Sequence, residues 1–99
     1  MTPTSSQSYS VYILWSTLGR CFYIGVSEDV AHRVIQHNAG VSKWTKRYAG
    51  TWQLVWQREF PSLGQARKFE NRLKKQKGGD GFWRLTELNR LQYESQSGS

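Results

Sequence analysis

Residues 9–26, which read YSVYILWSTLGRCFYIGV, set the fold of this chain. Side chains alternate between two faces over 9–15 and again over 21–26, with the period of two that is typical of β-strands. The segment between them, STLGR, is turn-like, so the stretch predicts a β-hairpin. If residues 16–19 form the loop, Tyr12 lies directly opposite Tyr23, and opposed residues project from the same sheet face. We therefore expect the two phenols to lie together.

The segment after the hairpin predicts a helix. Ser27 is a capping residue, and the two acids that follow it suit the positive end of a helix dipole. This helix runs to about Asn38, and Gly40 closes it. Arg33 and His37 are four residues apart and share a face. Arginine can hold a phosphate with two bonds and histidine can relay a proton, although the pair could also be an exposed arginine beside a half-buried histidine with no chemical role.

The rest of the chain predicts one more strand and two more helices. The strand covers residues 51–60, and the helices cover about 62–77 and 82–93. Trp52, Leu54 and Trp56 alternate and are expected on one face of the strand. The predicted order is β-β-α-β-α-α, which indicates a small α+β domain with its helices packed on a three-stranded sheet.

Glu70 is the most informative side chain of the 62–77 helix. The apolar residues of that helix mark a stripe about 120° wide, and Glu70 falls inside it. A carboxylate that points toward a core must be paired, hydrogen-bonded or bound to a metal. The alternative to a functional role is a salt bridge with Arg67 or Lys74, which lie one turn away on either side.

Positive charge is concentrated in one part of the chain. The 99 residues include 14 Lys and Arg against 7 Asp and Glu, which gives a net charge of +7. Residues 43–77 hold ten of the basic residues and only two acids, Glu59 and Glu70. Such a segment favours a polyanionic partner, nucleic acid above all, although a solvated surface explains a charge run equally well. The candidate nucleic-acid contacts are Lys43, Trp44, Lys46, Arg47, Arg67 and Lys74.

Composition excludes several classes of protein. A single cysteine excludes an internal disulfide framework and a cysteine-based zinc site. No apolar run approaches the roughly 20 residues that cross a bilayer, and the first residues do not resemble a secretory signal. We expect flexible tails at 1–8 and 95–99, one domain over 9–94, a cytoplasmic location and no membrane partner.

The candidate residues suit the hydrolysis of a phosphodiester with a single hard metal ion: they are two phenols, an Arg–His pair and one core-facing carboxylate. Mg²⁺ keeps several waters and often needs only one or two protein carboxylates besides phosphate oxygens. A bound metal lowers the pKa of its water, and arginine offsets the charge of the transition state. A tyrosine is an unusual base, because its ordinary pKa is about 10, and it needs help from a neighbouring group.

The order and spacing of these residues are similar to those of a known family. The sequence resembles the GIY-YIG nuclease superfamily over roughly residues 9–88, and in particular its small stand-alone bacterial members. The first signature strand reads VYIL at 11–14 and the second reads FYIG at 22–25, with ten residues between the tyrosines. The family's R-x-x-x-H-N motif is matched by Arg33, His37 and Asn38, residues 40–47 are similar to the loop that follows it, and Glu70 falls at the position of the metal-binding glutamate.

The resemblance implies a three-stranded antiparallel sheet flanked by three helices, and it assigns a role to each site residue. Tyr12 is then the general base or water-orienting phenol, Tyr23 a hydrogen-bonding group, Gly25 a point of close backbone approach, Arg33 the ligand of the scissile phosphate, His37 the support of the tyrosine, and Glu70 the ligand of Mg²⁺ or Mn²⁺. Two departures stand out. The first motif lacks its glycine and isoleucine, and residues 82–85, FWRL, lack an asparagine that many family nucleases have near the start of the last helix.

Three functions follow as hypotheses. The first is a metal-dependent endonuclease that cuts DNA, selective for structure or single strands rather than for sequence, because so small a domain has few elements free to read base edges. The second is a non-catalytic module that binds DNA or RNA through the basic 43–77 surface. The third is a catalytic domain that a protein partner targets, since no second domain is expected in the chain.

Overall fold

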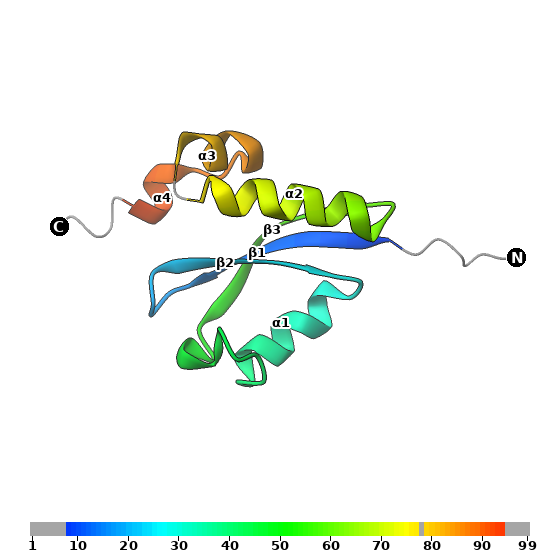
Figure 1. The fold of residues 1–99 in the computed structure, drawn as a ribbon. Coiled ribbons are helices and arrows are strands. Elements are labelled where there is room, and N and C mark those ends of the chain that lie inside the picture. Colours follow the sequence, from blue (N-terminus) through cyan, green and yellow to red (C-terminus); the bar gives the residue numbers. More distant parts are fainter. Residues whose placement is uncertain (1–7, 78, 95–99) are drawn as a thin grey trace, which may run out of the picture.

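The computed structural model describes residues 8–77 and 79–94, so the predicted tails lie outside the described residues except for Ser8. Its elements are β1 (Tyr9–Ser16), β2 (Cys21–Ser27), α1 (Val30–Asn38), the short 3₁₀ helix η1 (Lys46–Tyr48), β3 (Trp52–Phe60), α2 (Leu63–Lys75), α3 (Asp80–Thr86) and α4 (Arg90–Glu94). The three strands form one antiparallel sheet in the order β2-β1-β3. Helix α1 lies on one side of this sheet, and α2 lies on the other with α3 and α4 beyond it (Figure 1). The predicted α+β class and element order are confirmed.

The alternation of β1 divides the interior into two clusters, one on each face of the sheet. Val11 and Ile13 pack toward α2, and the cluster on that side also contains Ile24, Ala66, Leu73, Phe82, Trp83 and Tyr93. Tyr12 and Leu14 point the other way, toward Val30 of α1 and toward Trp52. Because β1 is the central strand, both of its faces are covered. The chain thus places a tyrosine in the middle of a sheet face, where it is shielded from water.

The hairpin register differs from the predicted one by two residues. Tyr12 lies opposite Gly25, and Leu14 lies opposite Tyr23. The reason is that β1 extends to Ser16, whose carbonyl accepts from the Arg20 amide at 2.8 Å, so that residues 17–20 form the loop. A shift of two residues keeps every side chain on its expected face. The two phenols are therefore still neighbours, with ring centroids 6.2 Å apart.

The prediction for β3 was wrong at Trp56. Ile13 pairs with Trp56, but the next residue of β1, Leu14, pairs with Leu54, which leaves Val55 as an extra residue. A β-bulge of this kind reverses the alternation of the strand that contains it. Trp56 therefore packs in the α2-side cluster, whereas Trp52 packs on the α1 side. Alternation alone cannot reveal a bulge, because every residue beyond it still alternates.

Two helix predictions also need correction. The 82–93 helix is divided into α3 and α4, because Glu87 adopts a left-handed conformation with φ 60° and stops α3 after Thr86. The cap of α1 is Asp29 rather than Ser27, since Asp29 Oδ1 accepts from the His32 amide at 3.1 Å. Over residues 8–77 and 79–94, the helices are too short or too polar to cross a lipid bilayer.

Candidate active site

Tyr12 is the centre of the candidate site. Its side chain is only 1% exposed, and its hydroxyl lies 2.9 Å from Nε2 of His37 on α1. Gly25, on the edge strand β2, is opposite Tyr12 and provides the room for its ring. A Cβ atom at Gly25 would lie 2.7 Å from the Tyr12 hydroxyl, closer than real Cβ contacts allow. The resemblance implies a close backbone approach at Gly25. In the structure, it is the backbone of β2 that lies close to the Tyr12 phenol.

His37 is held from its other side by a residue that the sequence did not single out. Its Nδ1 lies 2.6 Å from the hydroxyl of Thr45, which is 1% exposed, and the carbonyl of Thr45 accepts from Trp52 Nε1 at 2.9 Å. The side chain of Asn38 exchanges two hydrogen bonds with the backbone of Trp52, at 2.8 and 2.9 Å. The loop after α1 is therefore anchored at both ends. A threonine in a basic loop gives no signal that would have revealed this role.

Burial determines the protonation of both partners. It raises the pKa of Tyr12 to about 12, an effect that the nearby Arg33 opposes and the negative charge of Glu70 supports. Burial, together with the charge of Arg33, lowers the pKa of His37 to about 4. At neutral pH the site therefore contains a phenol and a neutral imidazole.

Hydrogen-bond capacity limits these bonds to two arrangements, because a neutral imidazole has one N–H. In the first, the Tyr12 O–H is donated to Nε2 of His37, and Nδ1–H is donated to the Thr45 hydroxyl. In the second, the Thr45 O–H is donated to Nδ1, and Nε2–H is donated to the Tyr12 oxygen. In both arrangements Tyr12, His37 and Thr45 form one buried polar chain. In the first, a proton that leaves Tyr12 has an acceptor already in contact.

Tyr23 and Arg33 form the part of this cluster that is open to solvent. Both are partly exposed, whereas Tyr12 and His37 are buried. The Tyr23 ring lies 4.8 Å from the His37 ring, between centroids, and Arg33 Nη1 donates to Gln36 Oε1 at 2.7 Å. The structure brings together the predicted residues Tyr12, Tyr23, Gly25, Arg33 and His37. An anion that approaches the cluster meets Arg33 and Tyr23 first.

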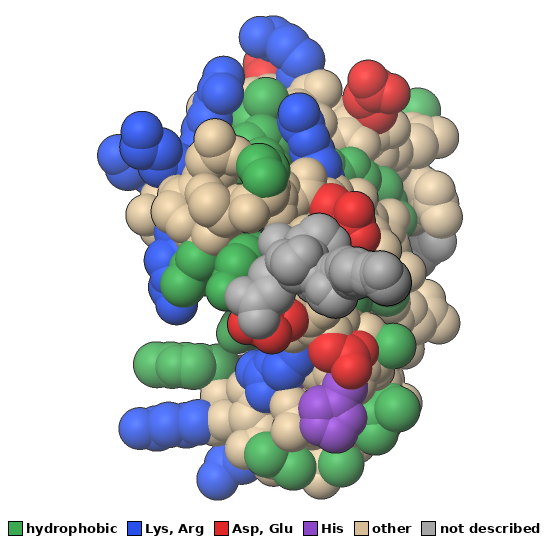
Figure 2. Space-filling view, turned by 90° about the vertical axis from the view of Figure 1, so that its right-hand side faces the viewer, with side chains coloured by type: hydrophobic (Ala, Val, Ile, Leu, Met, Phe, Trp, Pro, Cys, Tyr) green, Lys and Arg blue, Asp and Glu red, His purple; other side chains and the backbone are tan. Residues whose placement is uncertain are grey.

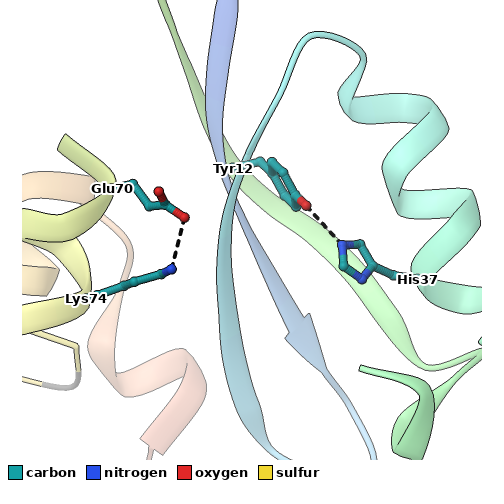
Figure 3. A network of polar contacts seen from close by, with 4 residues as sticks. All are labelled: Tyr12, His37, Glu70 and Lys74. Atoms are coloured by element: carbon teal, nitrogen blue, oxygen red, sulfur yellow. Dashed lines mark hydrogen bonds and ion pairs between the residues drawn. The ribbon is translucent and has the colours of Figure 1, made fainter. Parts of the chain in front are cut away.

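Glu70 lies on the other side of the sheet. Figure 3 shows Glu70 and Lys74 on α2 to one side of β2, and Tyr12 and His37 to the other. The buried position that the helix pattern predicted for Glu70 is confirmed, since it is 7% exposed. Of its two possible basic partners, Lys74 forms the ion pair, with 3.0 Å between Nζ and Oε2. Glu70 is nevertheless close enough for its charge to raise the pKa of Tyr12.

The donor set around Glu70, a single carboxylate, is of the kind that suits a hard cation. Within residues 8–77 and 79–94, no group of three or more His, Cys, Asp or Glu side chains comes together, so a zinc-type site is absent there. One carboxylate with water and substrate oxygens is a sufficient protein contribution for Mg²⁺. The Glu70 carboxylate fits that description, with Lys74 as the group that an ion must displace or share.

The predicted nucleic-acid contacts all lie at the surface. Each of Lys43, Trp44, Lys46, Arg47, Arg67 and Lys74 is exposed. On the face shown in Figure 2, Lys and Arg side chains gather along the left-hand border and the top, while most Asp and Glu side chains lie nearer the middle and right. The surface charge is therefore uneven in space as well as along the chain.

Comparison with known proteins places the chain in a family. Residues 8–82 match the model of a family described as the GIY-YIG catalytic domain. The chain belongs to the GIY-YIG family. A protein of Aeromonas salmonicida (strain A449) named "UPF0213 protein" is 36% identical over 77 residues, which cover 75% of this chain and 56% of that protein. The chain thus spans little more than half of the length of this relative.

The GIY-YIG match covers every element that contributes to the candidate site, from β1 to α2. It ends at Phe82, the first residue of the FWRL segment, which contains no asparagine. Here that region belongs to the interior, with Phe82 fully buried and Trp83 8% exposed in the α2-side cluster. The end of the matched region is therefore part of the core.

Proposed function

We propose that this GIY-YIG protein is a metal-dependent endonuclease that hydrolyses phosphodiester bonds in DNA, with selectivity for structure or single strands. The observation that carries the proposal is the convergence on one phenol: Tyr12 is hydrogen-bonded to a neutral imidazole, and both Arg33 and Glu70 are near enough to act on its ionisation. The membership in a family of catalytic domains supports it.

Arg33 and Tyr12 act first in the proposed mechanism. Arg33 binds the scissile phosphate, because it is a partly exposed cation at the mouth of the cluster. In the arrangement in which Tyr12 donates its O–H to His37 Nε2, the Tyr12 oxygen keeps a lone pair that accepts from the attacking water. The water loses its proton to Tyr12 while the Tyr12 proton passes to His37 Nε2. The water oxygen bonds to phosphorus, the bond to the leaving oxygen breaks, and that oxygen takes a proton from solvent. His37, now an imidazolium, returns its proton to Tyr12, and the proton that Tyr12 took from the water passes to solvent, which restores the neutral pair.

Glu70 would hold the divalent cation, Mg²⁺ or Mn²⁺. Bound there, the ion would supply positive charge to a developing phosphorane and a lowered pKa for coordinated water. The protein's own contribution is the position of the carboxylate: a 13-residue helix presents it from the buried side of α2, with Lys74 as its partner until an ion or phosphate arrives. The phosphate charge attracts Lys74 and releases the carboxylate oxygen.

A non-catalytic DNA- or RNA-binding module is the second candidate, and two observations favour it. Tyr12 is closed to solvent, and Lys74 already neutralises Glu70. A protein in this state binds phosphate through its surface cations and need not turn over. Both candidates use the same basic surface. They differ in whether Tyr12 becomes accessible to water and Glu70 is released from Lys74.

Replacement of Glu70 separates the two candidates. We expect Mg²⁺- or Mn²⁺-dependent nicking of DNA by the wild type and none by Glu70→Ala, while DNA binding persists, because the carboxylate holds the ion and not the strand. Glu59→Ala is the matched control, since Glu59 is the other acid of the basic segment and is exposed. Equal cleavage by Glu70→Ala, purified free of host nucleases, would overturn the nuclease proposal. Salt-sensitive binding with no turnover by the wild type would support the binding module.

A further inference from the structure

A groove of about 610 Å³ opens beside the candidate site, along the edge strand β2. Residues 21–24 of β2 form its floor. One wall contains Trp44, Tyr48 and Trp52 from the segment between α1 and β3 and the start of β3, and the other contains Lys74 and Lys77 from the end of α2 and the residues just after it. Ligand pockets usually measure about 300–1,000 Å³, so the groove has room for a nucleotide. It is continuous with the site, because Tyr23 contacts His37 and Lys74 holds Glu70.

The aromatic wall consists of two fixed rings, Trp52 and Tyr48, and one exposed ring, Trp44. Trp52 is fixed by its hydrogen bond to the Thr45 carbonyl, and Tyr48 packs edge-on against it with 6.3 Å between centroids. Trp44 is 80% exposed, which is unusual for the largest apolar side chain. Lys43 Nζ lies 6.0 Å from the Trp44 ring centroid. An open indole beside a cation is suited to stack on a nucleobase next to a phosphate.

The opposite wall is cationic. Lys74 and Lys77 are three residues apart, and both line the groove. Partial burial of its ammonium group lowers the pKa of Lys77; the nearby Cys21 opposes this shift, and the charge of Lys74 adds to it. Two ammonium groups that repel each other across from an aromatic wall are stabilised by an anion placed between them. The groove thus offers separate places for the two halves of one nucleotide.

We infer that this groove binds an unpaired nucleotide of the substrate strand beside the scissile phosphate, with its base on Trp44 and its phosphate between Lys74 and Lys77. The inference rests on the proposed nuclease function and gives it a source of selectivity. In a duplex the faces of a base are covered by its neighbours, so stacking on a protein ring requires a base that is already unpaired or extruded. An acidic peptide would satisfy the lysines but leave the tryptophan without a partner.

Two DNA probes test the inference through binding, in EDTA so that no cleavage occurs. Both are duplexes with the same single-stranded extension, and in the second probe the extension is made of abasic sugars that keep every phosphate. We expect the wild type to bind the first probe about tenfold more tightly, the size of one stacking contact. Trp44→Ala should bind the two probes alike, and Trp44→Phe should keep a preference. Ile35→Ala is the matched control, because Ile35 is 66% exposed on α1 away from the groove.

The cationic wall has its own pair of variants. Lys77→Gln should weaken binding to both probes about equally, whereas Lys75→Gln, on the opposite flank of α2, should weaken it less. Equal binding of both probes by the wild type, or a base preference that survives in Trp44→Ala, would overturn the groove assignment. Metal-dependent cleavage lost in Glu70→Ala would still uphold the nuclease in that case. Conversely, a Trp44-dependent preference without any cleavage would uphold the groove and reject the nuclease.

Discussion

At the scale of single residues, the protonation state of His37 decides whether Tyr12 has a proton acceptor in the candidate site. It is fully buried and lies between two hydroxyl groups, those of Tyr12 and Thr45. As a neutral imidazole it can accept the tyrosine proton, and as an imidazolium it cannot. The pKa of about 4 thus keeps the acceptor available throughout the neutral range. Burial therefore has two effects: it makes Tyr12 a poorer acid, and it keeps the neighbouring His37 imidazole neutral and able to accept a proton.

The pKa of His37 predicts that acid destabilises the fold. Its folded value is about 4 and its ordinary value is 6.5, so between these pH values the unfolded chain binds a proton that the folded chain does not. The free energy of unfolding should therefore fall as the pH drops from 6.5 to 4, by up to about 3 kcal/mol from this residue. Urea unfolding at several pH values measures it. His37→Gln should flatten that pH dependence, and His32→Gln, at an exposed histidine of the same helix, should not. Identical slopes in wild type and His37→Gln would refute the assignment.

At the scale of the elements, the edge strand β2 joins the parts of the site. Its Gly25 accommodates the Tyr12 ring, its Tyr23 extends the cluster toward solvent, and the helices on its two sides supply the other groups. An edge strand has one side that is not paired with another strand, so groups from the two faces of the sheet can approach each other around it. Glu70, on the α2 side, is near enough for its charge to raise the pKa of Tyr12, on the α1 side.

Gly25 and Gly64 form a matched pair for testing this arrangement. Gly25→Ala places a methyl group against the Tyr12 hydroxyl, and overpacking of this kind costs about 1–3 kcal/mol. Gly64 lies in the first turn of α2, and a Cβ atom added there would meet no other atom within 4 Å, so Gly64→Ala should stabilise the protein by up to about 1 kcal/mol. Thermal or urea unfolding measures both changes. A Gly25→Ala protein as stable as Gly64→Ala would show that the strand does not approach Tyr12 so closely.

On the scale of the whole molecule, the basic segment divides between two places. Lys43 and Arg47 lie against the aromatic rings of Trp44 and Tyr48 at the groove. A second pocket, of about 470 Å³, lies between β3 and the other flank of α2, and its basic residues are Arg58, Lys68 and Arg72. The sequence shows one run of positive charge because residues from both flanks of a helix follow one another closely along the chain. In space, only one part borders the candidate site.

Salt dependence of DNA binding distinguishes these two basic surfaces. Each phosphate contact contributes about 0.9 to the slope of log K against log salt concentration. The double variant Lys43→Gln, Arg47→Gln should lower the magnitude of that slope by about 2, whereas Lys68→Gln, Arg72→Gln should leave it nearly unchanged. Binding titrations at a series of salt concentrations provide the measurement. The opposite ranking would place the DNA on the β3 side and away from Tyr12.

Much of the fold and of the candidate site could be predicted from local patterns. Alternation placed Tyr12 and Tyr23 on one face, and helical periodicity placed Glu70 on the buried side of α2. Both patterns depend on the geometry of one element, which the sequence repeats with a fixed period. Thr45 could not be found in this way, because its contact with His37 depends on how a loop folds back on α1.

The sequence by itself determined the order of the elements and the face of each hairpin residue, since these depend on neighbours along the chain, and it named the candidate side chains for phosphate chemistry. The tertiary structure alone decided the hairpin register, the bulge that moves Trp56 to the other face and the partner that Glu70 takes. It also decided the protonation of Tyr12 and His37, which is set mainly by burial and by charges from other elements. The reason is physical: a period describes one element, whereas desolvation and packing depend on everything placed around it.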